Sequence, residues 1–305
     1  MRVAALMVIR NEVDIVATTV RYHRDAGVTD FFVLDNGSSD GTDRVLAGLA
    51  AEVPGLRWTK DDGPFAQSDM TTELARQARS AGADWVVTVD ADEFWSPGPR
   101  GFGAALAGHD EVGLEVQLQN FIQVRDVVAL SEGNLATMTV RAHPSRILGE
   151  GVREAVSAGV IAYAEMDYPP KWIARADPDL VIGKGAHTFS GLEGPRAAAA
   201  SITCLHAPLR ARDVFSQKAE QGRRSADLDP DPETSWHLKR WAALEAEGRL
   251  ETDWAANSYR MTEAGPVLDL PSGPVPAVRD TRLVDEVRPY LPRSGRRLFG
   301  RRKAR

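Results

Sequence analysis

Short apolar runs alternate with helical patterns over the first third of the chain. Apolar runs rich in β-branched residues occupy residues 3–9, 30–34, 55–59 and 85–89. Between them, apolar residues recur every three or four positions over residues 13–26, 43–49 and 68–81. Nearly continuous apolar runs are typical of strands buried on both faces, and strands that alternate with helices form βαβ units. The pattern therefore predicts a parallel sheet flanked by helices.

Three of these strands end in polar segments, at residues 10–12 (Arg-Asn-Glu), 35–42 (Asp-Asn-Gly-Ser-Ser-Asp-Gly-Thr) and 90–94 (Asp-Ala-Asp-Glu-Phe). Ligands of open α/β sheets bind at the carboxyl ends of strands. If the extended backbone continues past the fourth strand, Asp90 and Asp92 point the same way, and they repel each other unless a cation lies between them. Mg²⁺ uses one or two carboxylates plus substrate phosphates. The segment therefore predicts a metal–diphosphate site, although an acidic surface turn would have the same sequence.

The middle of the chain is less regular. Residues 113–121 alternate between apolar and polar positions, which predicts one half-buried antiparallel strand. Residues 169–175 and 201–205 are also strand-like, and the second of these runs places His206 at a strand end. Residues 211–260 are mostly helical, and the Pro- and Gly-rich stretch that follows is expected to form an extended arm.

Composition favours a soluble globular protein. Hydrophobic residues make up 43% and charged residues 26% of the 305 residues, and no window is long and apolar enough for a transmembrane helix. A single cysteine and the lack of a signal-peptide pattern favour a reducing, cytoplasmic location. The net charge of −6 argues against nucleic-acid binding. Residues 293–305 carry seven Lys and Arg and are expected to be a disordered tail, with peripheral contact to anionic membranes as the alternative.

Taken in order, the segments at 10–12, 35–42 and 90–94 resemble the nucleotide-sugar half of family 2 glycosyltransferases. The third segment resembles the subgroup that has an Asp-x-Asp-Glu-Phe signature. The run from Cys204 to Arg210 resembles the His-x-Pro-x-Arg element of that subgroup, although the Ser that usually follows is replaced by Ala211.

The resemblance implies an α/β GT-A fold, in which helices flank a Rossmann-like, mostly parallel central sheet. It implies a glycosyltransferase domain at residues 1–225, divided into a nucleotide-sugar-binding half (1–96) and an acceptor-side half (97–225). A helical and extended C-terminal extension (226–292) and the basic tail (293–305) are expected to follow.

The nucleotide is expected at the carboxyl edge of the sheet. Asp35 would accept hydrogen bonds from a ribose or a uracil imide, or would cap the turn. Asp40 would approach the base, cap the next helix, or do both. Glu12 would orient the nucleotide loop or stabilise the first helix electrostatically, with Asn11 as N-cap. The expected donor-binding residues are Asn11, Glu12, Asp35, Asn36, Asp40, Asp90, Ala91 and Lys171.

A divalent ion, Mn²⁺ or Mg²⁺, is expected to bridge Asp92, Asp90 and the diphosphate. A neutral imidazole suits Mn²⁺, which accepts mixed nitrogen and oxygen ligands, so His206 is the predicted third ligand and His187 its rival. Asp92 and His206 both follow strand-like runs, whose ends meet at one edge if they belong to a single sheet. Metal binding is then expected to weaken as the pH falls through about 6.5, the ordinary pKa of histidine.

The implied activity is a metal-dependent transfer of a sugar from a nucleoside-diphosphate sugar, most simply a UDP-sugar, to a saccharide, small-molecule or peptide acceptor with inversion. Inversion needs a general base within reach of the acceptor oxygen. Asp177 ranks first because its spacing from Asp92 resembles that of related enzymes, and Glu154 is kept beside it. Glu150, Asp167 and Asp179 are further candidates.

Other functions fit parts of the sequence. A haloacid-dehalogenase-type phosphatase also uses a strand that ends in Asp-x-Asp, but it has Thr or Val where this chain has Phe94. A nucleotide-sugar-binding protein without transferase activity would keep the same sheet, and it would bind a donor without turnover of any acceptor. After the first strand the sequence lacks the Gly-rich basic loop of sugar-1-phosphate nucleotidyltransferases and the Gly-x-Gly-x-x-Gly of nicotinamide-binding domains.

Overall fold

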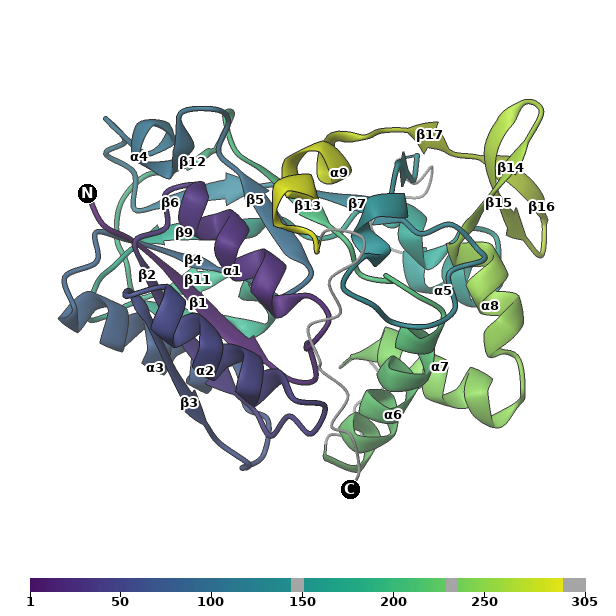
Figure 1. The fold of residues 1–305 in the computed structure, drawn as a ribbon, viewed down its shortest axis with the longest axis horizontal. Helices are drawn as coiled ribbons and strands as arrows, with labels where there is room; N and C mark the ends of the chain where they lie inside the picture. The colour runs from purple at the N-terminus through teal and green to yellow at the C-terminus, as the bar shows by residue number, and fades with distance from the viewer. Residues whose placement is uncertain (144–150, 229–234, 293–305) are drawn as a thin grey trace, which may run out of the picture.

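The computed structural model describes residues 1–143, 151–228 and 235–292. A seven-stranded sheet of order β12-β6-β9-β4-β1-β2-β3 forms its centre (Figure 1). Its strands are β1 (Val3–Ile9), β2 (Asp30–Asp35), β3 (Leu56–Lys60), β4 (Trp85–Thr88), β6 (Gly113–Val116), β9 (Lys171–Arg175) and β12 (Arg196–Ala198). Strands β1 to β4 are parallel, β9 runs antiparallel between β4 and β6, and β12 is parallel to β6. The chain therefore has an α/β fold with a mixed sheet.

Helices cover both faces of the parallel strands, because these strands are apolar on both sides. The helices are α1 (Val16–Asp25), α2 (Thr42–Glu52) and α3 (Gln67–Ser80). α1 and α2 bury side chains such as Val16 and Leu46 in the core on one face, and α3 buries Leu74 and Ala78 in the core on the other. Each fully buried Val or Leu contributes roughly 1.5–3 kcal/mol, so the apolar faces hold these helices on the sheet.

The start of α1 differs from the prediction, whereas its end agrees. Asn11 does not cap the helix, which begins only at Val16. Its Oδ1 accepts a hydrogen bond from the Ser39 backbone N–H (2.9 Å), and its own N–H donates to Ser38 Oγ (2.8 Å). Asn11 therefore ties the segment after β1 to the loop after β2. α1 ends beside Gly27, whose φ of 102° suits glycine.

A second, five-stranded sheet has the order β17-β8-β7-β13-β5. Its strands are β5 (Glu93–Ser96), β7 (Leu118–Ile122), β8 (Val140–Arg141), β13 (Thr203–His206) and β17 (Val278–Arg279). The single strand predicted at residues 113–121 is two strands, because the chain leaves the first sheet after Val116 and enters the second at Leu118. β4 and β5 also belong to different sheets, so residues 89–92 connect the first sheet to the second.

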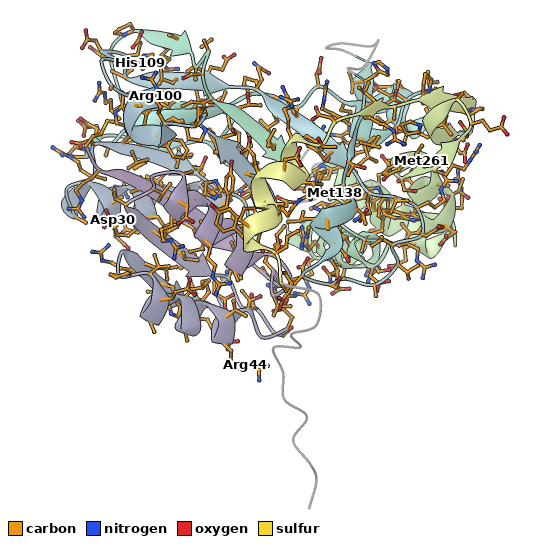
Figure 2. The ribbon with its side chains drawn as sticks, turned by 45° about the horizontal axis from the view of Figure 1, so that its top comes forward. Asp30, Arg44, Arg100, His109, Met138 and Met261 are labelled. Carbon is orange, nitrogen blue, oxygen red and sulfur yellow. The ribbon has the colours of Figure 1, made fainter. Side chains whose placement is uncertain are left out.

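A second group of helices packs around Phe215, Trp241 and Trp254. It consists of α5 (Val152–Ser157), α6 (Asp213–Leu228), α7 (Trp236–Ala246) and α8 (Leu250–Asn257). The stretch predicted as an extended arm instead forms an antiparallel sheet of β14 (Tyr259–Thr262), β15 (Gly265–Leu270) and β16 (Gly273–Pro276). β15 buries every second residue, which requires paired strands. This sheet lies at one end of the molecule, with Met261 exposed (Figures 1 and 2).

The end of the described chain returns to the N-terminal core. α9 (Arg282–Val287) lies between the two halves of the molecule (Figure 1) and buries its apolar side chains. Glu286 accepts hydrogen bonds from Ser96 Oγ (2.8 Å) and from the Tyr22 hydroxyl. The C-terminal extension is therefore fastened to the main body, and the tail predicted at residues 293–305 lies outside the described residues.

The remaining elements are short: α4 (Gly101–Ala105), η1 (Asn134–Thr137), η2 (Tyr163–Glu165), η3 (Lys184–Ala186), η4 (Arg288–Tyr290), β10 (Val181–Ile182) and β11 (Phe189–Ser190). α6 runs across residue 225, where the sequence predicts a boundary, and the domain division stays a prediction. In the part of the chain that the structure describes, no helix has the length and apolar character to cross a membrane.

Candidate functional site

Asp92 and His206 come together where the two sheets meet. β13 pairs antiparallel with β5, so His206 lies opposite Glu93, and the Ala207 backbone N–H donates to the Asp92 carbonyl (2.8 Å). Asp92 Oδ1 lies 3.7 Å from His206 Nε2. The two residues are close, as expected, but the second sheet brings them together and not the edge of a single sheet. We call Asp92 and His206 the open pair.

Hydrogen bonds fix the tautomer of His206. Asn120 Nδ2 donates to the Met166 carbonyl (3.3 Å), so Asn120 Oδ1, which is 2.8 Å from His206 Nδ1, is the acceptor of that contact. Burial lowers the pKa of His206 to about 4, against the charge of Asp92. The imidazole is therefore neutral near pH 7, with its proton on Nδ1 and the Nε2 lone pair toward Asp92. A cation between these two acceptors would relieve their repulsion.

Asp90 has a different partner. The Glu93 N–H donates to the Asp90 carbonyl (3.0 Å), so residues 90–93 form a turn and the extended geometry expected for the two aspartates does not continue. Lys171 Nζ lies 2.7 Å from Asp90 Oδ2 and 2.5 Å from Glu93 Oε1. Burial lowers the pKa of Lys171, but the two carboxylates outweigh burial and raise it, so the ammonium stays charged. We call Asp90, Glu93 and Lys171 the lysine cluster.

The lysine cluster changes two expected roles. Lys171 is buried and faces these carboxylates instead of an open position for a diphosphate. Of the three expected ligands, only Asp92 and His206 lie together, and among the described residues no group of three or more His, Cys, Asp or Glu could hold a metal ion. One carboxylate and one imidazole fit Mn²⁺ or Mg²⁺ if phosphate oxygens complete the shell. The Ala91 carbonyl accepts a hydrogen bond from the Thr19 hydroxyl, which is a structural role.

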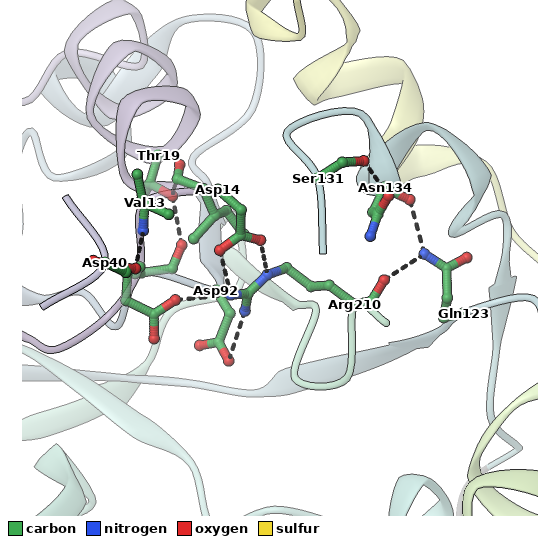
Figure 3. Close-up of polar contacts among 12 residues, drawn as sticks. Val13, Asp14, Thr19, Asp40, Asp92, Gln123, Ser131, Asn134 and Arg210 are labelled. Atoms are coloured by element: carbon green, nitrogen blue, oxygen red, sulfur yellow. Dashed lines mark hydrogen bonds and ion pairs between the residues drawn. The ribbon is translucent and has the colours of Figure 1, made fainter. Parts of the chain in front are cut away.

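Arg210 is a site residue that the sequence analysis gave no role. Its buried guanidinium donates to Glu12 (2.8 Å) and to both oxygens of Asp14 (2.8 and 3.0 Å), and Nη1 lies 3.8 Å from Asp92 Oδ2 (Figure 3). Burial lowers the pKa of Arg210, but the charges of Glu12 and Asp14 outweigh burial, so the pKa is raised overall. Arg210 therefore joins the segment before α1 to the segment after β4. The only signal for it was its place in the His-x-Pro-x-Arg element.

Glu12 connects Arg210 to the loop after β2. Burial raises the pKa of Glu12 to about 7, and Arg210 opposes that shift. The Glu12 backbone N–H donates to Thr42 Oγ1 (2.9 Å), at the start of α2. The Glu12 backbone thus contacts the loop of residues 35–42, while its carboxylate pairs with Arg210, and a role of this side chain in nucleotide binding stays a prediction.

Asp35 keeps one unsatisfied oxygen. Its Oδ1 accepts the Ser38 backbone N–H (2.9 Å), whereas its buried Oδ2 has no hydrogen-bond partner among the described residues. A buried acceptor without a partner costs about 1–3 kcal/mol, and native proteins usually satisfy such groups. Asp35 therefore caps the turn and also offers a free acceptor to a ligand.

Asn36 and Asp40 shape the same loop. Asn36 Nδ2 donates to the carbonyls of Asp61 (3.1 Å) and Gly63 (3.2 Å). Asp40 Oδ1 accepts the Thr42 backbone N–H (2.9 Å), and its Oδ2 accepts the backbone N–H of Val13 (3.1 Å; Figure 3). These bonds are structural, and contact of either side chain with a nucleotide stays a prediction.

The two candidate bases that follow β9 lie at the wrong edge of the sheet. β9 is antiparallel to β4, so the chain begins β9 at Lys171 in the site and reaches Asp177 and Asp179 at the opposite edge. This placement removes the geometric basis for Asp177 as general base. Glu154 is exposed on α5, and Glu150 lies outside the described residues.

Asp167 is the candidate base whose two chain neighbours contact His206 or its partner Asn120. The preceding residue, Met166, accepts the hydrogen bond from Asn120. The following residue, Tyr168, packs edge-on against the His206 ring, with centroids 5.4 Å apart. Asp167 itself is exposed. Met166 therefore contacts Asn120, which orients His206, and Tyr168 contacts the His206 ring itself.

His187, the rival ligand, lies near Lys171. Its Nδ1 is 3.1 Å from the Pro170 carbonyl, the residue before Lys171. Burial lowers its pKa, and the charge of Lys171 lowers it further. No contact among the described residues joins His187 to Asp92, so the geometry favours His206.

Comparison with known proteins gives distant likenesses. No family model matches. Over 186 residues the chain is 27% identical to a phosphoribosyl imidazole-4-carboxamide isomerase of Opitutus terrae. The aligned region covers 52% of this chain and 76% of the isomerase.

Three solved structures are similar to this chain over 78–91% of its length, with TM-scores of 0.39–0.42. TarS residues 1–349 of S. aureus match at 9% identity and a TM-score of 0.42, over 91% of this chain and 98% of that chain. The same TarS segment in complex with UDP matches at 10% identity and a TM-score of 0.39, over 78% and 69%. The mannosyltransferase PcManGT of Pyrobaculum calidifontis, in complex with GDP-Man and Mn²⁺, matches at 17% identity and a TM-score of 0.40, over 83% and 72%. A function for this chain therefore rests on its own residues.

Proposed function

We propose that this chain is a metal-dependent glycosyltransferase with a GT-A fold. It moves a sugar from a nucleoside-diphosphate sugar, in the simplest case a UDP-sugar, to an acceptor with inversion. The observation that carries the proposal is the open pair, in which Asp92 Oδ1 and the bare Nε2 of His206 face each other at 3.7 Å. This pair lies just beyond the carboxyl end of β4, where α/β sheets bind ligands. A divalent ion held there would share its remaining positions with a diphosphate.

The charges around the open pair support a bound cation. Five carboxyl groups and two buried cations meet here: Glu12, Asp14, Asp90, Asp92 and Glu93 with Lys171 and Arg210. Burial raises the pKa of Glu12 to about 7 and that of Glu93 to about 8, so these two groups are partly protonated near pH 7 and the three aspartates carry most of the negative charge. Charges removed from water are stable when they are paired or when they coordinate a metal. The excess of negative charge favours a divalent ion and disfavours an anionic ligand that arrives without one.

The free oxygen of Asp35 supports the nucleoside part of the donor. A uracil imide N–H or a ribose hydroxyl would satisfy Oδ2, which no described residue does. Asp35 ends β2 and Asp92 follows β4, with β1 between these two strands. β2 and β4 lie two strand spacings apart, roughly 9–10 Å, which suits a nucleoside at the end of β2 and its diphosphate beyond the end of β4.

Each residue has a distinct role in this proposal. When bound, the ion supplies Lewis-acid stabilisation of the negative charge on the leaving diphosphate. Asp92 and His206 hold the ion, and Arg210 keeps Asp92 and Glu12 in place. Asp167 takes the proton of the acceptor oxygen as that oxygen attacks the sugar from the face opposite the diphosphate.

Calorimetric titration of UDP with and without Mn²⁺ tests the proposed function. We expect UDP binding that depends on Mn²⁺. A thermal-shift panel of UDP-, GDP- and TDP-sugars then identifies the donor, because a ligand at a hundred times its Kd stabilises the fold by about 2.7 kcal/mol. Equal UDP affinity in both conditions would contradict the metal site, and the absence of binding to every nucleotide sugar would contradict the whole proposal.

Substitution of the two candidate bases separates catalysis from binding. Asp167→Asn is expected to lower turnover by roughly 100-fold, within the usual range for a general base, and to leave UDP affinity unchanged. Asp177→Asn, at the opposite edge of the sheet, is the matched control and should keep full activity. Donor binding without turnover in the unmodified protein would instead favour a binding protein.

A further inference from the structure

A cavity lies between α5, α7 and α8, three helices of the second helical group (Figure 1). Its wall comes from α5 and the residues that follow it, from α7 and α8, and from Pro271 after β15. Its volume is about 110 Å³. A cavity of about 150 Å³ holds benzene, so this one has room for a group of a few heavy atoms. Among the residues that the structure describes, none that lines the cavity belongs to the open pair or to the lysine cluster.

The Asp253 carboxylate in the cavity wall already has its hydrogen-bond donors. Arg240 binds it with both terminal nitrogens (2.9 and 2.6 Å), Trp241 Nε1 donates to it (2.8 Å), and Asn257 Nδ2 lies 3.4 Å away. The side-chain oxygen of Asn257 accepts the Ala164 backbone N–H (3.0 Å). These acceptors are therefore occupied, and Asp253 fixes the guanidinium of Arg240 in the wall.

The donors in the wall are not used up in the same way. A guanidinium has five N–H groups, and the two bonds to Asp253 leave three N–H groups of Arg240 for another partner. Arg249 lines the same cavity and is exposed, and it pairs only with the exposed Glu247 (2.8 Å) among the described residues. Such surface pairs contribute about 0–1 kcal/mol, so a ligand can compete for Arg249. The hydroxyls of Ser157 and Thr252 add two more donors.

We propose that this cavity binds an anion, namely the phosphate or carboxylate group of a small ligand. An anion brings acceptors and no donors, which is the complement of a wall whose own carboxylate is occupied. The planar fork of arginine matches the oxygens of carboxylate and phosphate groups, and here Arg240 and Arg249 come from two different helical segments. The volume admits one such group and excludes a nucleoside diphosphate. The site is separate from the donor site proposed above and does not depend on that function.

Calorimetric titration of the metal-free protein tests the site. A chelating resin removes metal without adding an anionic chelator, and the excess of negative charge at the open pair then disfavours an anion there. Sodium phosphate and sodium acetate are titrated separately at constant ionic strength. We expect saturable binding of one anion per chain, and the tighter of the two shows whether the natural group is a phosphate or a carboxylate. Absence of saturable binding of both anions would overturn the proposal.

Two variants of the wall locate the bound anion. Arg249→Gln is expected to weaken binding roughly tenfold, because a charged donor is lost, and Thr252→Val roughly threefold, because a neutral donor is lost at nearly constant shape. Both positions are exposed, so both variants should fold, and thermal melting checks this.

Arg288→Gln is the matched control, since Arg288 is also exposed and pairs with an exposed carboxylate, but does not line the cavity. It should leave the anion affinity unchanged, and equal losses in Arg249→Gln and Arg288→Gln would mean unspecific attraction and overturn the site. Asp92→Asn separates the cavity from the open pair. It removes a negative charge and would tighten an anion bound beside His206, whereas an anion in the cavity should keep its affinity. A tightened anion would therefore overturn the cavity as the site, and the dependence of UDP binding on Mn²⁺ tests the proposed function independently.

Discussion

The lysine cluster and the open pair come from the same four-residue turn, yet one is closed and the other open. In the lysine cluster, Lys171 from β9 of the first sheet lies within 2.7 Å of Asp90 and Glu93. In the open pair, His206 from β13 of the second sheet lies 3.7 Å from Asp92 and is neutral. The role of each carboxylate is therefore set by the sheet that supplies its partner. Asp90 and Glu93 bind the Lys171 ammonium closely and stabilise the fold, whereas Asp92 has only the longer 3.8 Å contact with Arg210 at Oδ2 and turns Oδ1 toward the neutral His206.

The largest effect is expected when the lysine cluster loses its cation. Lys171→Met leaves Asp90 and Glu93 without their shared partner, and removal of one member of a buried ion pair typically costs about 3–5 kcal/mol. Urea unfolding measures this loss of stability. The exposed Lys184→Met is the control and should stay within about 0.5 kcal/mol of the unmodified protein. An unchanged stability of Lys171→Met would show that the cluster is not a structural unit.

Substitution of each aspartate sharpens the contrast between the two regions. Asp92→Asn keeps the shape of the side chain but removes the charge of the proposed ligand, and we expect Mn²⁺-dependent UDP binding to weaken about 100-fold, or about 2.7 kcal/mol. Asp90→Asn leaves Lys171 paired with Glu93 and should weaken binding less than about tenfold. Calorimetry of UDP with Mn²⁺ measures both. Equal losses would mean that both aspartates bind the ion.

The two regions should also respond differently to acid. Burial holds the pKa of His206 at about 4 in the folded protein, below its ordinary value of 6.5. Between these values the unfolded chain binds a proton that the folded chain does not, so stability is full above pH 6.5 and is lost as the pH falls toward 4. We expect His206 to account for a loss on the order of 3 kcal/mol at pH 4. In the lysine cluster, Lys171, whose pKa is raised, stays protonated throughout this range. Burial raises the pKa of Glu93 to about 8 against the charge of Lys171, so this carboxyl group takes up its proton at a higher pH than His206 does.

Unfolding of the unmodified protein and of His206→Asn between pH 7 and 4 isolates this contribution. Other buried histidines such as His23, whose pKa burial also lowers to about 4, cancel in the difference. Parallel stability curves for the two proteins would contradict the assignment. The same shift moves the expected loss of metal binding from about pH 6.5, the sequence-based expectation, to a value near the pKa of about 4.

The smallest effect on metal affinity is expected from Asn120, which contacts His206 but does not belong to the open pair. Asn120→Leu removes the acceptor of His206 Nδ1–H, so the imidazole is no longer held in one orientation and tautomer. Loss of such a supporting group typically lowers metal affinity 10–100-fold, and we expect about tenfold because Tyr168 still packs on the ring. Asn120→Asp restores an acceptor and should bind Mn²⁺ with UDP nearly as the unmodified protein does. A fall in both variants would show that the orientation of His206 is not what Asn120 controls.

The secondary structure of the first 96 residues was largely predictable because it depends on patterns in nearby sequence. The four parallel strands and the three helices between them follow from runs and periods within about ten residues, and the four strands predicted as parallel are parallel. The short strand β5 was not predicted, because it pairs with the distant β13. The polar segments after β1, β2 and β4 lie at the sheet edge that their position in the βαβ order requires. The nearness of Asp92 and His206 was also expected, from the rule that strand ends gather at one edge.

The tertiary structure decided what depends on pairing between distant strands. Residues 113–121 read as one strand, and only the two sheets divide them into β6 and β7. The direction of β9 moves Asp177 away from the site and brings Lys171 to Asp90, and no property of residues 171–177 alone fixes that direction. Local sequence determines which segments become strands and where charges occur. Partners of a buried charge come from far along the chain, so only the assembled sheets show which carboxylates are neutralised and which stay open.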